Sequence, residues 1–368
     1  MRFACLFLLA AGCSSGPGAS EDGFVPLFNG KDFMGWVRVN CAPETFRVED
    51  GIIISTGKPT GVMRTERMYE NYVIELDWMH MKKGGNAGLF VHSGAVPVKG
   101  TPFTKGHEIQ VLDGDSPDGS WTGHGDVFSI HGATFEPDRK HPKGWMRCLP
   151  SEKRANPVGQ WNHYRVTVND GTIKLEVNGK AVSGGTKCNP RKGYICLESE
   201  GSECRFKNIR VKELPSTNPP ESEVAEADQG FKSLYTGLDF RGWKPHTGSM
   251  EGWKTSDWAF EGAATGSVLW TDREFGDFAL LFDWRTKKEG EAKVYLKKDS
   301  SIRFPTESKP GQWNRVEITA SNGQCTVLQN GKHVPLDVRV PAFPKGPIGL
   351  HAALDSVQFT NVFIKELP

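Results

Sequence analysis

The segment GHEIQVLDGDSPDG, at residues 106–119, combines a strand-like alternation with a run of acids. Ile109 and Val111 alternate with polar residues that include Glu108, and Asp113 follows where the alternation ends. In a β-strand this pattern sends the apolar pair to one face and Glu108 to the other. Carboxyl groups fixed in this way can act as general base and general acid. We therefore take Glu108 and Asp113 as candidate catalytic residues, although an Asp before Gly can also be a turn residue that bonds its own backbone.

Two nearby histidines supply groups that titrate near neutral pH. His92 lies in GLFVHSG, where it alternates with Leu89 and Val91 and is expected to share a face with Phe90. His124 lies in WTGHGD, where the flanking glycines let the backbone approach a ligand closely. Both are candidate catalytic residues. For His92 the open alternative is a histidine satisfied by hydrogen bonds within the sheet.

The same candidates are side-chain types that bind divalent ions. Their spacing matches no compact metal motif, so a divalent metal stays an open alternative and no cofactor is assigned. Trp121 is a candidate for stacking on a substrate ring, and the alternative for it is a core position. The chain shows no phosphate loop, nucleophile elbow or dinucleotide fingerprint.

The elements around these residues contain motifs that occur twice along the chain. LFNGKDFMGW at 27–36 returns as LYTGLDFRGW at 234–243, and FKNIRVKELP at 206–215 returns as FTNVFIKELP at 359–368. Order is preserved, and a proline-rich acidic segment separates the copies. The repeat predicts a first domain that carries the site at residues 23–215, a linker at 216–228 and a shortened second domain at 229–368. Residues 1–22 precede these domains and are predicted to be an export segment and tether.

The two copies differ in length at one place. Trp78 and Trp161 are 83 positions apart, whereas their counterparts Trp284 and Trp313 are 29 positions apart. The first copy therefore carries about 54 extra residues, which include the acidic segment described above. We expect the second copy to lack catalysis and to serve as scaffold or binding module, while a decorative loop is the alternative for the extra segment.

Composition favours an all-β fold. The chain has 42 Gly, 21 Phe and 11 Trp, and alternating apolar runs are separated by turn residues such as Asn-Asp-Gly after NHYRVTV. Meandering strands of this kind predict two-layer β-sandwiches. A net charge of +1 gives no large field that would favour nucleic acid as a partner.

The N-terminus predicts export. MRFACLFLLAAGC has an early charge and an apolar run too short to span a membrane, and LAAGC resembles a bacterial lipobox. Lipidation of Cys13 would anchor the protein in the cell envelope, and plain secretion is the alternative. Export permits disulfides, and Cys196 and Cys204 flank a predicted hairpin in which they could face each other; buried thiols are the alternative.

The series LFNGKDFMGW, GGNAGLFVHSG, HEIQVLD, GQWNHYRVTV and FKNIRVKEL resembles the 3-keto-disaccharide hydrolase family, also known as domain of unknown function 1080. The resemblance implies concanavalin A-like or laminin G-like jelly-roll sandwiches, a carbohydrate substrate and cleavage of sugars oxidised at C3. The family pattern falls on Asn86, Gly88, Glu108, Gln110 and Asp113, of which Asn86 and Gln110 are expected to bind substrate.

Two positions depart from the family pattern. His107 stands where an aromatic residue is usual and is taken as a further substrate-binding candidate, and Glu200 stands where a histidine is common. The favoured function is an exported enzyme that removes the C2 proton of a 3-keto-glycoside and eliminates the group at C1. The alternative is a non-catalytic carbohydrate-binding or cell-surface adhesion protein.

Overall fold

The structure is a computed structural model. It describes residues 22–246, 249–263, 266–298, 300–305, 309–335, 345–352 and 357–368. Strands dominate these residues, which contain one short 3₁₀ helix, η1 (Glu221–Glu223), and no α-helix. No helix in the described ranges has the length and apolarity needed to cross a bilayer. The predicted all-β fold is confirmed, and Cys13 lies outside the described residues.

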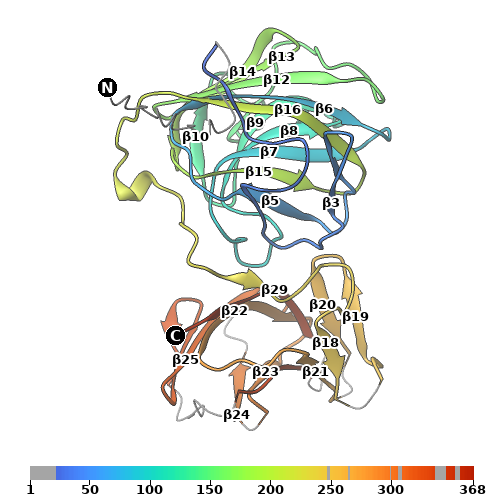
Figure 1. Ribbon diagram of the computed structural model, residues 1–368, viewed down its shortest axis with the longest axis vertical. Coiled ribbons are helices and arrows are strands. Elements are labelled where there is room, and N and C mark those ends of the chain that lie inside the picture. The colour runs from blue at the N-terminus through green and yellow to red at the C-terminus, as the bar shows by residue number, and fades with distance from the viewer. Residues whose placement is uncertain are drawn as a thin grey trace, which may run out of the picture.

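The first sandwich consists of two antiparallel sheets, named here the β6 sheet and the β8 sheet (Figure 1). The β6 sheet has the order β10 (Thr134–Pro137), β14 (Lys180–Asn189), β13 (Thr172–Val177), β12 (Asn162–Asn169), β6 (Tyr72–His80), β16 (Cys204–Glu213), β4 (Ile52–Ser55) and β3 (Phe46–Glu49), and β1 (Val25–Pro26) also pairs with β16. The β8 sheet has the order β11 (Arg147–Cys148), β9 (His124–Ile130), β8 (Gly106–Leu112), β7 (Asn86–Ser93), β15 (Tyr194–Ser199), β5 (Gly61–Thr65) and β2 (Trp36–Arg38).

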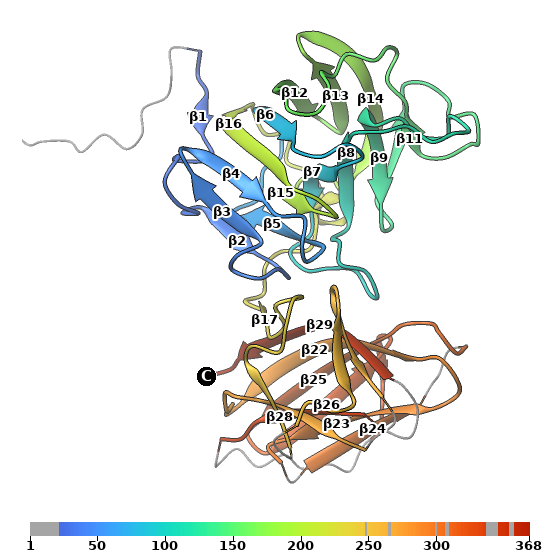
Figure 2. The same ribbon diagram turned by 90° about the vertical axis from the view of Figure 1, so that its right-hand side faces the viewer.

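The second sandwich also consists of two sheets, the β22 sheet and the β23 sheet (Figure 2). The β22 sheet has the order β19 (Trp253–Ser256), β20 (Ala259–Gly262), β29 (Val357–Glu366), β22 (Phe278–Thr286), β25 (Asn314–Ser321), β26 (Gln324–Gln329) and β27 (Lys332–His333), and β17 (Lys232–Ser233) also pairs with β29. The β23 sheet has the order β18 (Trp243–Pro245), β21 (Val268–Thr271), β28 (Ile348–His351), β23 (Glu291–Leu296) and β24 (Ser300–Pro305).

Each core is formed by apolar side chains at alternate positions of the strands. In β8, Ile109 and Val111 enter the core of the first sandwich, as the sequence predicted. In β15 the same core receives Ile195 and Leu197. Because side chains in a strand alternate between faces, every second residue of β8 and β15 is left on the outer face of the β8 sheet. That outer face carries the candidate site.

Details of the two sandwiches match. The indole Nε1 of Trp36 donates to the Leu27 carbonyl oxygen at 2.7 Å. Trp243 donates to the Leu234 carbonyl oxygen at 2.6 Å, at the corresponding place in the second sandwich. Burying an indole is favourable when its N–H finds an acceptor, so these tryptophans stabilise the fold in both sandwiches.

Two predicted hairpins have different outcomes. The turn after NHYRVTV is a hairpin between β12 and β13, with Asp170 and Gly171 at φ 45° and 71°. The predicted hairpin between Cys196 and Cys204 is wrong, because β15 belongs to the β8 sheet and β16 to the β6 sheet. The chain crosses between sheets there, and each cysteine within the described residues is a free thiol.

The connection between β7 and β8 contacts the second sandwich. The Gly100 backbone N–H donates to Asp283 Oδ2 at 2.9 Å, and Arg315 Nη2 donates to the Pro97 carbonyl oxygen at 2.8 Å. Figures 1 and 2 both show this connection reaching toward the β22 sheet. The connection between β7 and β8 therefore joins the two sandwiches.

Candidate active site

Glu108 is buried on the outer face of the β8 sheet. Its strand pairs with β7 on one side and β9 on the other, and only 7% of the residue is exposed. A carboxyl group buried to this degree is costly to ionise unless it is paired or hydrogen-bonded. Its position therefore needs a reason other than the stability of the sheet.

Strand β15 brings two further carboxyl groups to the same face. Glu198 and Glu200 alternate with the core residues Ile195 and Leu197, so they point away from the core. Glu198 is 1% exposed, and its Oε2 has no hydrogen-bond partner among the described residues. Sequence reasoning missed Glu198, although the alternation in YICLESE carries the signal.

Gly88 in β7 makes room for these carboxyl groups. A Cβ atom at this position would lie 2.8 Å from Glu198 Oε2 and 3.1 Å from Glu108 Oε1. The two carboxyl groups therefore approach each other over the one residue without a side chain. The Asn-x-Gly pattern has a steric explanation here, since any larger residue would separate the glutamates.

Burial raises the pKa values of all three glutamates, and nearby carboxylates add to each shift. Burial, with the nearby Glu200 carboxylate, raises the pKa of Glu108 to about 8, although the Arg147 guanidinium opposes the shift. Burial and Glu108 raise the pKa of Glu198 well above its ordinary value. Burial also raises the pKa of Glu200, with a contribution from Asp257. Glu108 therefore holds its proton at neutral pH, and the same burial favours the neutral form of the other two carboxyl groups.

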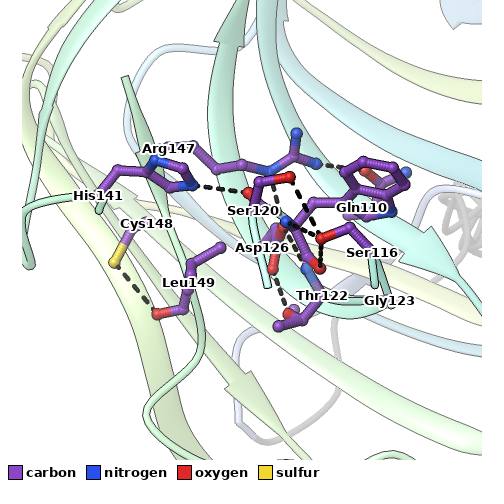
Figure 3. A network of polar contacts seen from close by, with 12 residues as sticks. Gln110, Ser116, Ser120, Thr122, Gly123, Asp126, His141, Arg147, Cys148 and Leu149 are labelled. Atoms are coloured by element: carbon purple, nitrogen blue, oxygen red, sulfur yellow. Dashed lines mark hydrogen bonds and ion pairs between the residues drawn. The ribbon is translucent and has the colours of Figure 1, made fainter. Parts of the chain in front are cut away.

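A chain of hydrogen bonds crosses the face beside the glutamates. Arg147 Nη2 donates to Gln110 Oε1 at 2.7 Å (Figure 3). Gln110 Nε2 then donates to Asn86 Oδ1 at 3.0 Å. Asn86 Nδ2 completes the chain by donating to Glu200 Oε2. Both amides are oriented by this chain, and it brings the two expected substrate-binding residues, Asn86 and Gln110, to the acidic cluster.

Besides its bond to Gln110, Arg147 is fixed by two further contacts. Its Nε donates to Asp126 Oδ2 at 2.6 Å, and its guanidinium stacks on Phe128 with 3.8 Å between Cζ and the ring centroid. Asp126 also accepts from the backbone N–H and hydroxyl of Thr122 (Figure 3). Arg147 is therefore held as a positive charge beside Gln110 and the acidic cluster, a role that its sequence context did not reveal.

The site is reached from one end of the strands. Asn86, Glu200 and Arg147 are partly exposed, whereas Phe90 on the same face is fully buried. Phe103 packs edge-on against Phe90, with 6.1 Å between ring centroids. A substrate would therefore approach the glutamates from the side of Asn86 and Glu200.

The predicted grouping of Glu108 with Asp113 is wrong. The two residues are five positions apart along an extended segment, which corresponds to roughly 17 Å. Asp113 Oδ2 accepts from the Gly84 backbone N–H at 2.9 Å, and Oδ1 lies 3.8 Å from His124 Nε2. The His124 ring stacks on Trp78, with 5.4 Å between centroids. Asp113 and His124 thus lie together, but apart from the acidic cluster.

His92 and His107 are buried in the sheet rather than exposed to substrate. His92 Nε2 bonds the Glu70 carbonyl oxygen, and His107 bonds the Pro190 carbonyl oxygen, each at 2.9 Å. The prediction that His92 shares a face with Phe90 is wrong, because the left-handed backbone at His92, with φ 53°, breaks the alternation. Both nitrogens of His107 are hydrogen-bonded, whereas Nδ1 of His92 is buried without a partner among the described residues, so the alternative of a satisfied sheet histidine is met for His92 only at Nε2.

The proposed metal ligands do not come together. Within the described residues, no group of three or more His, Cys, Asp or Glu side chains is arranged to hold a metal ion. The candidate ligands lie in three separate places: His92 in β7, Glu108 in β8, and the Asp113–His124 pair at the end of β8. Trp121 is 37% exposed, so its ring is accessible, and substrate stacking on it stays a prediction.

Comparison with known proteins identifies the class. Residues 23–212 and 303–365 match the family described as 3-keto-alpha-glucoside-1,2-lyase-like domain. The chain belongs to this family of glycoside-cleaving enzymes, as the sequence resemblance predicted. It is 23% identical to a curated 3-keto-disaccharide hydrolase from Bacteroides thetaiotaomicron over 245 residues, which cover 52% of this chain and 79% of the relative.

The chain is also similar in part to solved structures. A protein from Parabacteroides distasonis, provisionally assigned as a glycosyl hydrolase, is 26% identical and covers 54% of this chain and 99% of its own, with a TM-score of 0.42. The carbohydrate-binding module CBM66 from Bacillus subtilis is 12% identical and covers 49% of this chain and 96% of its own, with a TM-score of 0.35.

Proposed function

We propose that the protein cleaves 3-keto-glycosides at the acidic cluster of the β8 sheet. The observation that carries the proposal is the set of three outward-facing glutamates with raised pKa values beside the fixed Arg147 guanidinium. A structural role gains nothing from such a set, since ionising buried carboxyl groups costs free energy. Family membership supports the same substrate class.

The reaction begins with removal of a proton. A carbonyl at C3 acidifies the proton on C2, and Glu108 in its ionised form takes this proton. The electron pair forms an enolate, whose negative oxygen is stabilised by the Arg147 guanidinium. The C1–O bond then breaks, and Glu198, whose pKa is raised by burial and by Glu108, donates its proton to the leaving oxygen. Later addition of water to the unsaturated sugar makes the net reaction a hydrolysis.

The test is turnover of a 3-keto-glucoside and of its unoxidised parent by the full chain and by Glu108→Gln. We expect the wild type to cleave only the keto-sugar, and Glu108→Gln to lose roughly 10²–10⁴-fold in kcat/KM. Cleavage of the parent would indicate direct two-carboxylate chemistry at C1 instead. Binding of keto-sugar without any turnover would support the alternative of a carbohydrate-binding protein.

Folding of the variant can be checked by its stability. Because burial raises the pKa of Glu108 from 4.5 to about 8, the native state holds the proton more tightly than the unfolded state. The stability contributed by the neutral carboxyl group is complete below pH 4.5 and is lost as pH rises through about 8. Glu108→Gln removes this loss, so its melting temperature at pH 8 should equal or exceed that of the wild type.

We also propose export and anchoring through a lipid on Cys13. The support is the short apolar segment followed by LAAGC. Stable anchoring needs more than one acyl chain, as bacterial lipoproteins have. Cys13→Ala should move the protein from the membrane fraction to the soluble fraction, whereas a wild-type protein found only in the soluble fraction would favour plain secretion.

Finally, we propose that residues 23–215 and 229–368 are two copies of one domain. Beyond the repeated motifs, the paired strands β6–β16 and β22–β29 share a register shift. In the first sandwich the shift lies between Lys207 and Arg210 of β16, which pairs with β6. In the second sandwich it lies between Leu281 and Asp283 of β22, which pairs with β29. A shared irregularity of this kind supports common descent, because regular sheets do not require it.

A further inference from the structure

The outer face of the β23 sheet surrounds a cavity of about 710 Å³. Cavities of a few hundred to about 1,000 Å³ are typical of small-molecule sites. Aromatic and basic side chains dominate its lining. They are Lys244, His246, Trp270, Tyr295, Lys298 and His351. The cavity belongs to the second sandwich and is separate from the acidic cluster of the first.

Rings form a continuous row in this cavity. The Trp270 and Tyr295 rings have centroids 5.4 Å apart, and Tyr295 lies 6.0 Å from His351. Trp270 Nε1 donates to His246 Nδ1 at 3.1 Å. A Cβ at Gly349 would lie 2.7 Å from Trp270 Cζ3, so the indole crosses β28 where only glycine permits it. The rings are therefore held in place before any ligand binds.

The charge around these rings is positive. Lys293 Nζ donates to the Tyr295 hydroxyl at 2.7 Å and lies 4.4 Å from the ring centroid. Lys244 and Lys298 are exposed at the cavity, and Glu274 is the one carboxylate among the described residues that line it. Among the residues that the structure describes, the two lysines that line the cavity and Lys293 beside it outnumber the one lining carboxylate, and this excess of positive charge favours an anionic ligand over a neutral one.

His351 adds a neutral hydrogen-bonding group. Burial, with the nearby Lys293 ammonium, lowers its pKa. The ring is therefore uncharged at neutral pH and can accept or donate one hydrogen bond. Its Nδ1 is buried and has no hydrogen-bond partner within the described part of the chain, so a ligand hydroxyl could supply one.

We propose that this cavity binds an acidic oligosaccharide that contains uronic acid units. The apolar faces of the sugar rings pack against Trp270 and Tyr295, and the carboxylates pair with the lysines. The site goes beyond the proposed catalysis. It would hold an acidic glycan on the second sandwich, independently of the 3-keto-sugar on the first.

The experiment is calorimetric titration of the full chain with trigalacturonate, trimannuronate and a hyaluronan tetrasaccharide, with cellotriose as the neutral comparison. We expect at least one uronate probe to bind more tightly than cellotriose, and more weakly as salt is added. Lys298→Glu should weaken that binding about tenfold, because it reverses a charge at the cavity. Tyr295→Ala should weaken it as well.

Matched controls make the outcome decisive. Lys332→Glu reverses an exposed lysine on β27, in the other sheet of the same sandwich, and should leave binding unchanged. Glu108→Gln should also leave binding unchanged, which separates this site from catalysis. Absence of binding by all three uronate probes, equal binding of cellotriose, or insensitivity to both Lys298→Glu and Tyr295→Ala would overturn the proposal.

Discussion

The outer faces of the β8 sheet and the β23 sheet share one strand register but carry opposite chemistry. In the first, Phe90 pairs with Cys196 and Glu108; in the second, Tyr295 pairs with Gly349 and Ser301. One step along the strands, Gly88 faces Gln110, and Lys293 correspondingly faces Arg303 and His351. The acids Glu108 and Glu198 thus correspond to Ser301 and His351.

The difference shows which residues the fold requires. Core positions stay apolar in both sandwiches, as with Leu197 and Leu350, which occupy corresponding places in β15 and β28. The outer faces are free to differ because they do not build the core. Function therefore depends on the side chains of the face rather than on the sandwich itself. Lys293 corresponds to Gly88, and its side chain would by itself prevent two carboxyl groups from approaching each other closely there.

The largest effect expected from this comparison is that of Glu198→Gln. The substitution keeps the volume and removes the proton donor, so kcat/KM for a 3-keto-glycoside should fall roughly 10²–10⁴-fold. Glu291→Gln makes the same chemical change on the second face, where Glu291 pairs with Arg303. It should leave turnover unchanged. Comparable losses in both variants would mean that the faces do not differ in the proposed way.

The next largest effect is that of Gly88→Ala. The added Cβ would lie 2.8 Å from Glu198 Oε2, so the carboxyl groups must move. Displacements of about 1 Å at a reacting centre can cost about 100-fold, and we expect a loss of that size in kcat. Lys293→Ala, at the corresponding position, should not change turnover. An active Gly88→Ala enzyme would show that the close pair of carboxyl groups is dispensable.

The sequence was sufficient for the fold and for half of the site. Alternation placed Glu108 and Gln110 outside and Ile109 inside, and the repeat separated scaffold residues from site residues. Glu198 and Arg147 were missed because they reach the site through β15–β7 and β9–β11 pairing. The alternation in YICLESE predicts the outward direction of Glu198, but no local pattern predicts which distant strands pair with β15 and β9.

The misplaced histidines have a different physical reason. Period-two reasoning assumes a regular strand, but His92 adopts a left-handed conformation and leaves the face predicted for it. Asp113 lies beyond the last residue of β8, where alternation no longer fixes the direction of a side chain. Both errors occurred at the ends of strands, where the backbone is least regular.

A smaller effect is expected for Arg147→Met. The guanidinium lowers the pKa of Glu108, so its loss should raise that pKa above about 8. The base must be ionised, so the rise of kcat/KM with pH should move to higher pH by about one unit, and this shift alone should lower activity at pH 7 about tenfold, in addition to the loss of enolate stabilisation. Because Asp126 would be left unpaired, the double variant Arg147→Met, Asp126→Asn guards against misfolding. An unshifted profile in both would remove Arg147 from the mechanism.

The smallest effect tests whether the second sandwich tunes the first. Asp257 accepts a hydrogen bond from the Thr60 backbone N–H at 2.9 Å, and its charge contributes to the raised pKa of Glu200. Asp257→Asn keeps an acceptor oxygen but removes the charge, so the pKa of Glu200 should fall, and only slightly, because the charge of Asp257 is exposed and screened. Side-chain carboxyl NMR titration would measure this shift, with Asp239→Asn as a control on the same sandwich. An unchanged Glu200 pKa, or an equal shift in the control, would show that the second sandwich affects the acidic cluster only through general charge or not at all.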